Sequence, residues 1–177
     1  MDLYSILKLL HIASAMLWAG GLAGLLMLQA GEARSGPAGL LASARRTARF
    51  ARVIVGPAAV GSLLFGGALV YMAWSVLDLW IAMALSGFLA TFVVDAFLVG
   101  RLERLLPDAD AAPSPEAMAV AGRILNAARF DALVLFSILA LMVLKPGTQD
   151  AALAAAVATV VLAGGVLLLR PRRAVPG

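Results

Sequence analysis

The chain has 177 residues, of which 63% are hydrophobic and 14% are charged, and its mean hydropathy is +0.98. Soluble domains carry about 25% charged residues, so this composition excludes a soluble monomer and predicts a protein that crosses a membrane several times. The chain has no cysteine, which excludes disulfides, thiolate nucleophiles and cysteine metal sites. The formal charge of +4 indicates membrane topology before it indicates nucleic acid, because basic residues gather in cytoplasmic loops.

Five apolar stretches can cross a bilayer, for which a helix needs about 20 residues. In chain order they are residues 3–28, 53–74, 79–99, 126–144 and 151–169. The basic segment 40–52 is compatible with a helix, so it either extends the second span or lies on anionic headgroups. We therefore expect residues 1–177 to form a single all-α domain, a polytopic transmembrane helix bundle.

The basic residues predict how the bundle is oriented. All twelve arginines lie between the first and second spans, between the third and fourth, or after the fifth. Only Lys8 and Lys145 fall on the opposite side. Basic loops stay in the cytoplasm, so we expect the N-terminus outside and the C-terminus inside, in the cytoplasmic membrane of a bacterium.

Polar and small residues mark the ends and faces of the spans. Residues 108–115 are typical of a turn, and Ser114-Pro115-Glu116 has the pattern of an N-cap, a first-turn proline and a first-turn acid. We expect a helix to start there and run toward the fourth span. Four glycines allow close helix packing, either inside one bundle or at a face for a second copy or a larger membrane complex: Gly20, Gly24, Gly164 and Gly165.

One face of the first span carries its polar and aromatic residues. They recur at spacings of three and four, which places them on one helical stripe: Tyr4, Lys8, His11, Ser14 and Trp18. His11 is the only histidine of the chain. Polar groups that face acyl chains are costly, so we expect this stripe to face protein or headgroups, with His11 as the candidate ligand of a pocket.

The depth of His11 in the bilayer decides its surroundings. If His11 lies near the outer edge, the residues at its level supply soft ligands: Met72, Met83 and Met142. If His11 lies deeper, its level supplies space and hydroxyl groups: Gly67, Gly87, Ser137 and Thr159. The simpler alternative is a structural histidine that donates to a backbone carbonyl or to a hydroxyl, namely that of Ser86, Ser137 or Thr159.

Two carboxylates lie inside the third and fourth spans, Asp95 and Asp131. A buried charge without a partner is costly, and arginines crowd the same level. We therefore expect structural ion pairs that join the two carboxylates to Arg52, Arg101 or Arg129; a functional carboxylate is the alternative. A proton relay needs a second carboxylate or a histidine at mid-bilayer, and the sequence indicates none.

Known catalytic patterns are absent from the sequence. It contains no P-loop, no HExxH motif and no dinucleotide-binding fingerprint after a strand. The glycines lie inside apolar stretches instead of phosphate-binding loops. The sequence therefore assigns no reaction.

The first span contains Leu7-Lys8-Leu9-Leu10-His11, followed by Trp18-Ala19-Gly20-Gly21-Leu22. These motifs resemble the opening helix of small bacterial membrane proteins of the HemJ and CopD-like type, and the resemblance continues at Arg52 to Pro57, Phe65-Gly66 and Leu144-Lys145-Pro146. It implies a helical bundle in which His11 ligates haem b. HemJ itself oxidises protoporphyrinogen IX and carries a basic residue about one turn after a tryptophan of its third span. Here Trp80 is followed by Ile81-Ala82-Met83-Ala84, so we do not expect that activity.

Two functions follow as expectations. The first is an inner-membrane protein that binds haem b or a metal ion through His11. The further residues of that pocket are Trp18, Met72, Met83 and Met142. The second is a structural or accessory subunit of a larger membrane complex, without a cofactor.

Overall fold

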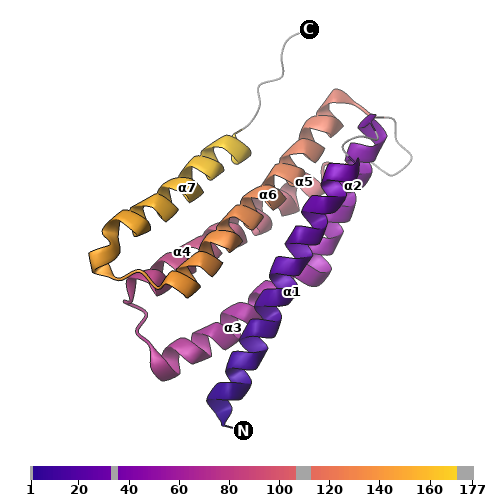
Figure 1. Ribbon diagram of the computed structural model, residues 1–177. Coiled ribbons are helices and arrows are strands. Elements are labelled where there is room, and N and C mark those ends of the chain that lie inside the picture. The colour runs from indigo at the N-terminus through magenta and orange to yellow at the C-terminus, as the bar shows by residue number, and fades with distance from the viewer. Residues whose placement is uncertain (1, 33–35, 107–112, 171–177) are drawn as a thin grey trace.

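The computed structural model describes residues 2–32, 36–106 and 113–170. These residues form helices and no strands, and five helices are long and apolar enough to cross a membrane (Figure 1). The spans are Leu3–Glu32, Gly36–Ala73, Leu79–Glu103, Pro115–Leu144 and Thr148–Leu169. The expected all-α bundle is confirmed, and its orientation in a membrane stays a prediction.

Several spans consist of more than one helical segment. In chain order the segments are α1 (Leu3–Glu32), α2 (Gly36–Phe50), η1 (Ala51–Val55), α3 (Gly56–Ala73), α4 (Leu79–Val93), η2 (Val94–Val99), α5 (Gly100–Glu103), α6 (Pro115–Leu144), η3 (Thr148–Asp150) and α7 (Ala151–Leu169). Helix α2 continues through η1 into α3, so the basic segment 40–52 extends the second span. The first, third and fourth spans are also longer than expected, because each continues as helix beyond its apolar part.

A proline explains the π-helical turn η1 inside the second span. Proline lacks an N–H, and in a regular α-helix its ring clashes with the carbonyl four residues earlier. Pro57 stands at the start of α3, and the wider turn before it lets the Gly56 N–H bond to the Ala51 carbonyl, five residues back. The π-helical turn η2 has the same bond from the Gly100 N–H to the Asp95 carbonyl. Such turns are frequent at functional sites.

Helix α6 lies at the centre of the bundle. It contacts α1, α2, α4, α5 and α7 and has more buried residues than any other helix. Its N-cap is as expected, because Ser114 accepts a hydrogen bond of 3.1 Å from the Ala117 N–H. Helix α7 has no buried residue and packs mainly on α6, so it lies at the edge.

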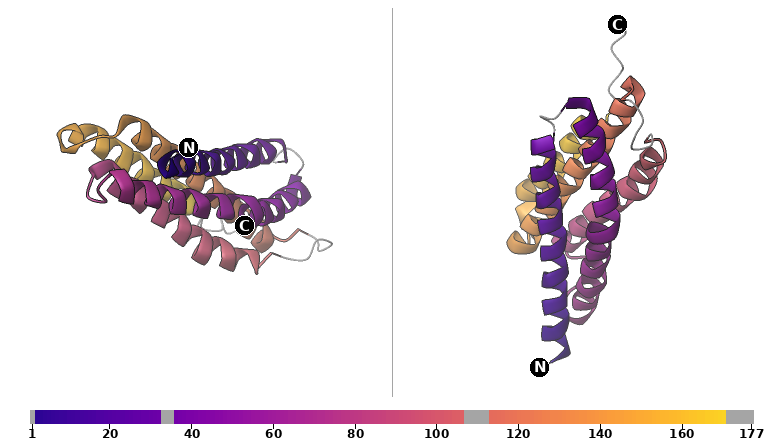
Figure 2. Two further views of the ribbon diagram at one scale, coloured as in Figure 1. Left: turned by 90° about the horizontal axis from the view of Figure 1, so that it is seen from below. Right: turned by 90° about the vertical axis from the view of Figure 1, so that its right-hand side faces the viewer.

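The helices run up and down along one long axis (Figure 2). The N-terminus and the α3–α4 and α6–α7 connections lie at one end of the bundle (Figure 1). The start of α2, the end of α5 and the start of α6 lie at the other end. Arginines therefore gather at the second end, as the topology prediction requires.

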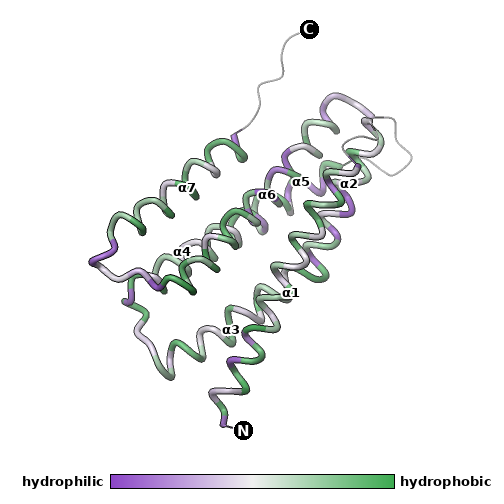
Figure 3. The backbone as a smooth tube through the Cα atoms, in the orientation of Figure 1, coloured by the Kyte–Doolittle hydropathy of each residue, from purple (hydrophilic) through white to green (hydrophobic). Residues whose placement is uncertain are grey.

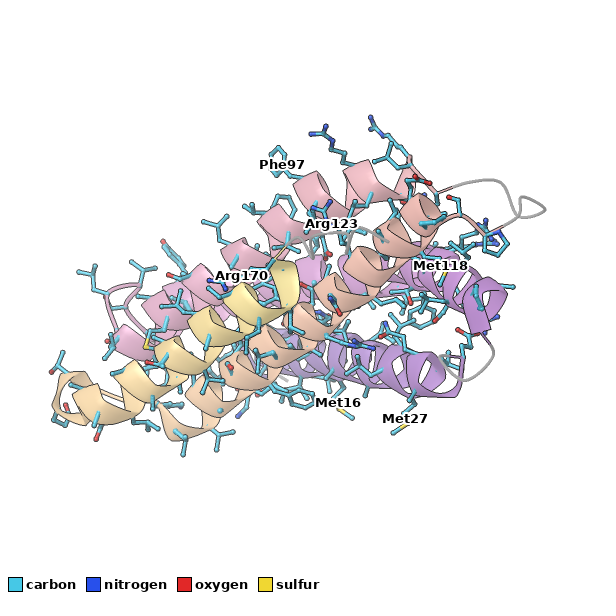
Figure 4. The ribbon with its side chains drawn as sticks, turned by 90° about the horizontal axis from the view of Figure 1, so that it is seen from above. Met16, Met27, Phe97, Met118, Arg123 and Arg170 are labelled. Carbon is cyan, nitrogen blue, oxygen red and sulfur yellow. The ribbon has the colours of Figure 1, made fainter. Side chains whose placement is uncertain are left out.

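Large apolar side chains cover the outside of the bundle. Met16 and Met27 of α1 and Phe97 of η2 project outward and are 70%, 76% and 72% exposed (Figure 4). Hydrophobic residues continue along the middle of each long helix, and hydrophilic ones cluster toward the ends (Figure 3). This distribution fits lipid around the middle of the bundle, because apolar side chains at such positions would be buried in a soluble domain.

The paired glycines are used in different ways. A methyl group on Gly164 would overlap the side chain of Leu133, and one on Gly165 would lie 3.2 Å from the Phe130 ring. These two glycines therefore let α7 approach α6 within one chain, which is one of the two expected uses, and a role at a face for another chain stays a prediction. Gly20 and Gly24 have open space at the same position, so their role in an oligomer stays a prediction.

Candidate functional site

A cavity of about 690 Å³ opens between α1, α3, α4 and α6. We call it the aromatic cavity, because rings and two lysines dominate its wall: Tyr4, Lys8, His11, Trp18, Trp74, Trp80, Phe88 and Lys145. Four of the five stripe residues of the first span line it. The fifth, Ser14, faces α3 instead, where a methyl group on Gly61 would lie 2.9 Å from its Oγ. The expected polar face of α1 therefore exists and borders a cavity.

His11 is held by the backbone of α3. Its Nδ1 lies 2.9 Å from the Ser62 carbonyl oxygen, and the Ser62 hydroxyl is 3.5 Å away. A carbonyl can only accept, so Nδ1 carries the proton and donates it, which leaves the lone pair on Nε2. Within the described part of the chain, Nε2 has no hydrogen-bond partner. The half-buried imidazole thus presents a free basic nitrogen at the cavity.

Gly66 makes room for this imidazole. A methyl group at residue 66 would lie 2.9 Å from Cε1 and 3.0 Å from Nδ1 of His11, closer than side-chain atoms pack. Ser62 and Gly66 stand four residues apart, so they share one face of α3. That face carries both the acceptor and the space that fix the ring. The sequence reasoning named Gly66 only as part of the Phe65-Gly66 resemblance and did not identify Ser62.

The structure brings together only part of the expected pocket. Trp18 and Met142 line the aromatic cavity with His11, whereas Met72 and Met83 do not. Met72 points away from the bundle and is 46% exposed. His11 therefore lies beside Gly66 and shares its cavity with one methionine, and its depth in a bilayer stays a prediction.

The hydroxyl groups expected around His11 have other partners. Ser86, Ser137 and Thr159 each donate to a carbonyl four residues earlier in their own helix, at 2.7 to 2.9 Å. A hydroxyl that donates to a carbonyl of its own helix already has an acceptor for its hydrogen. The backbone carbonyl of Ser62 is therefore the partner of His11, in agreement with the carbonyl named as one alternative.

Lys145 and two tryptophans form one rim of the aromatic cavity. The rings of Trp74 and Trp80 meet edge to face at 5.3 Å, and the Lys145 ammonium lies 4.3 Å from the Trp74 centroid. A cation over an indole face is attracted by its electrons. Lys145 caps α6 in the left-handed conformation, with φ of 44°, which turns the chain at this rim.

The donor set of the cavity fits a haem better than a bare metal ion. A structural zinc site uses four protein ligands, and a catalytic one uses three. Within the described residues, no three His, Asp or Glu side chains lie together as a metal site. Haem iron takes only one or two ligands from the protein, His alone or His with Met. His11 and Met142, one residue of each kind, both line the aromatic cavity.

A second cavity of about 340 Å³ lies next to the first. We call it the carboxylate cavity, because Asp95 and Asp131 line it together with the pair Arg52 and Glu103. The two aspartate carboxyl groups lie within hydrogen-bonding reach of each other. Asp131 is only 6% exposed, and its Oδ1 has no partner within the described residues.

The expected arginine partners of these aspartates lie elsewhere. Arg52 pairs with Glu103, and Arg129 donates to Asn126 at 3.1 Å. Arg101 is exposed and joins no aspartate within the described ranges. Long arginine side chains reach water or headgroups at the bundle end, while the short aspartate side chains stay inside. Another ion pair, Arg46 with Glu32 at 2.5 Å, links α2 to α1.

Trp18 and Phe88 separate the two cavities. Their rings meet edge to face with centroids 5.7 Å apart and planes at 77°. Both side chains line both cavities. The candidate site therefore has two compartments, one with a histidine and one with a carboxylate pair, on either side of one aromatic contact.

Comparison with known proteins gives a family but no relative of established function. The family model described as "Predicted integral membrane protein (DUF2269)" matches residues 5–146, which cover the first four spans with His11, Asp95, Asp131 and Lys145. No curated protein and no solved structure matches the chain. The match spans most of the 177 residues, so the chain belongs to the DUF2269 family of predicted integral membrane proteins.

Proposed function

We propose that this membrane protein binds haem b in the aromatic cavity, where Nε2 of His11 would hold the iron. The observation that carries the proposal is the hydrogen bond from His11 Nδ1 to the Ser62 carbonyl. Ligating histidines usually donate their other ring nitrogen to a carbonyl or carboxylate, which fixes the tautomer and raises ligand basicity. His11 has that arrangement, and its second nitrogen is free at the cavity.

The rest of the cavity supports a flat, amphipathic ligand with acidic groups. Trp18, Phe88 and Trp80 offer apolar faces for a macrocycle, and aromatic faces favour stacked contacts. Lys8 and Lys145 at the cavity wall are suited to the two propionates of a haem. Met142 is the residue of this wall whose thioether could provide a second ligand to the iron. When bound, the haem supplies a redox-active iron.

The resemblance to HemJ and CopD-like proteins supports the same site and limits the activity. The motif that carries the resemblance contains His11 and Trp18, and both line the aromatic cavity. The third span has Ile81, Ala82 and Met83 after Trp80, where HemJ-type proteins have a basic residue. We therefore propose haem binding without oxidation of protoporphyrinogen IX.

Replacing His11 with alanine is expected to lower the haem affinity at least about tenfold, because losing even a residue that orients a metal ligand costs about 10- to 100-fold. Wild type and His11→Ala are expressed with haem supply and purified from the same membranes. Absorbance in the Soret region and the extracted haem are then measured. Met142→Leu is expected to change the spectrum of bound haem. Met72 lies outside the cavity, so Met72→Leu is the matched control and should leave the spectrum unchanged.

Two results would contradict this proposal. One is wild-type protein that carries no haem although haem is supplied. The other is a His11→Ala protein with wild-type haem content and spectrum. Either result would favour the alternative, a structural or accessory subunit without a cofactor.

We further propose that the arginine-rich end faces the cytoplasm of a bacterium. Since the chain has no cysteine, single cysteines report accessibility directly. Leu77 in the α3–α4 turn is 88% exposed, and Arg104 beyond α5 is also exposed. A membrane-impermeant maleimide on intact cells is expected to label Leu77→Cys, and Arg104→Cys only after permeabilisation. The reverse pattern would invert the topology.

A further inference from the structure

We propose that Asp95 and Asp131 form a proton-binding site, in which one carboxylic acid and one carboxylate share a single proton and exchange it through the carboxylate cavity. This site is separate from the histidine of the aromatic cavity. It therefore does not depend on haem binding there. Four observations carry it: the contact between the two carboxyl groups, their burial, the absence of an arginine partner within the described residues, and the cavity beside them.

The contact between the carboxyl groups decides their charge. Asp95 is half-buried on η2, and Asp131 is 6% exposed on α6. Two carboxylates in contact away from water cannot both stay ionised, because each disfavours the charge of the other. One proton between them removes one charge and supplies the only donor that such a pair can have.

The Oδ1 atom of Asp131 receives no hydrogen bond within the described residues. It is also buried. An ionised oxygen in that position would lack any donor, which is costly. A proton on the pair gives one of the facing oxygens a donor and removes the need for a positively charged side chain.

The charged groups around the pair do not replace this proton. The other charged residues that line the cavity are Arg52 of η1 and Glu103 of α5. They neutralise each other in an ion pair. The segments of α1 and α3 that line the cavity contribute apolar residues and glycine. Arg129, two residues before Asp131, is exposed and donates to Asn126.

The carboxylate cavity gives the proton a path to water. It reaches from Asp131 to the Arg52–Glu103 pair at the arginine-rich end. Proton release would pass the proton to water in this cavity and leave two facing anions. Asp95 and Arg52 both stand on π-helical turns, a backbone feature that is common at functional sites. The two aspartates are thus placed to take up and release their shared proton from the arginine-rich end.

Infrared spectroscopy of the full-length protein in lipid nanodiscs tests the proposal. At neutral pH the wild type is expected to show the carbonyl stretch of a protonated carboxylic acid. The band should shift in D₂O and decay as the pH rises. It should be absent in Asp95→Asn and in Asp131→Asn, because the asparagine amide donates to the remaining carboxylate and replaces the shared proton. Glu116→Gln, which removes an exposed carboxyl group, is the matched control and should keep the band.

The wild-type measurement alone can overturn the proposal, even if a variant fails to fold. A wild type without the band at neutral pH would mean that both carboxylates are ionised and hold a cation or an arginine. A band that survives in both folded asparagine variants would assign the proton to another group. A His11→Ala protein that lacks haem and keeps the band would separate this site from haem binding.

Discussion

Gly66→Ala is expected to weaken haem binding as much as His11→Ala does, while the free energy of unfolding changes little. The added methyl group would lie 2.9 Å from Cε1 of His11, so the imidazole must move away from α3. That movement breaks the bond from Nδ1 to the Ser62 carbonyl and turns Nε2 out of its position. We expect the haem content to fall to that of His11→Ala, measured as Soret absorbance per protein.

Stability is expected to be preserved because two small terms oppose each other. A lost hydrogen bond costs about 1 kcal/mol, and alanine in place of glycine gains about 1 kcal/mol inside a helix. Gly67→Ala is the control, since Gly67 lines the same cavity and a methyl group there meets nothing within 4 Å. If Gly66→Ala bound haem like Gly67→Ala, the position of His11 against α3 would not matter for ligation.

The architecture of the bundle follows from local properties of the sequence. Apolar length determines where a helix can cross a bilayer, and Ser114 and Pro115 mark the start of α6 through capping chemistry. The span ends were less predictable, because the helix-compatible segment 40–52 and the helix expected after Ser114 both continue into a span and start it earlier than its apolar stretch. Hydropathy measures transfer into lipid, whereas a helix continues wherever its backbone hydrogen bonds are made.

The histidine face was predictable and its partners were not. Helical periodicity placed His11 and Trp18 on one stripe. Which helix the stripe meets depends on tertiary packing, so nothing in the sequence connected Ser62 or the Phe65-Gly66 pair with His11. Methionines at an equal depth were weaker candidates for the same reason. Depth does not determine rotation about the helix axis, and rotation places Met142 in the cavity and turns Met72 outward.

The carboxylate pair shows the same limitation for charges. The predicted spans place Asp95 and Asp131 at the same depth as several arginines, and this position predicts ion pairs. The long arginine side chains instead reach the bundle end or Glu103, and the two aspartates face each other. A short side chain is confined to the helix face on which it stands, so helix rotation decides its partner.

Gly87→Leu is expected to cause the largest loss of stability of the substitutions considered. Gly87 stands on α4 against α6, where a Cβ atom would already lie 3.1 Å from Cγ1 of Val134 and 3.4 Å from two atoms of Ile138. Both residues are buried, Val134 completely, and β-branched side chains have little rotamer freedom. Neither can give way, so α4 must move from the central helix.

Overpacking of this kind costs about 1 to 3 kcal/mol and sometimes more. Close packing is important between membrane helices, because lipid provides no hydrophobic driving force for their association. Thermal unfolding of the detergent-solubilised protein measures the effect. Gly20→Leu is the matched control, because Gly20 is exposed on α1 and a Cβ atom there meets nothing within 4 Å. Equal unfolding temperatures for the two variants would mean that α4 and α6 do not touch at Gly87.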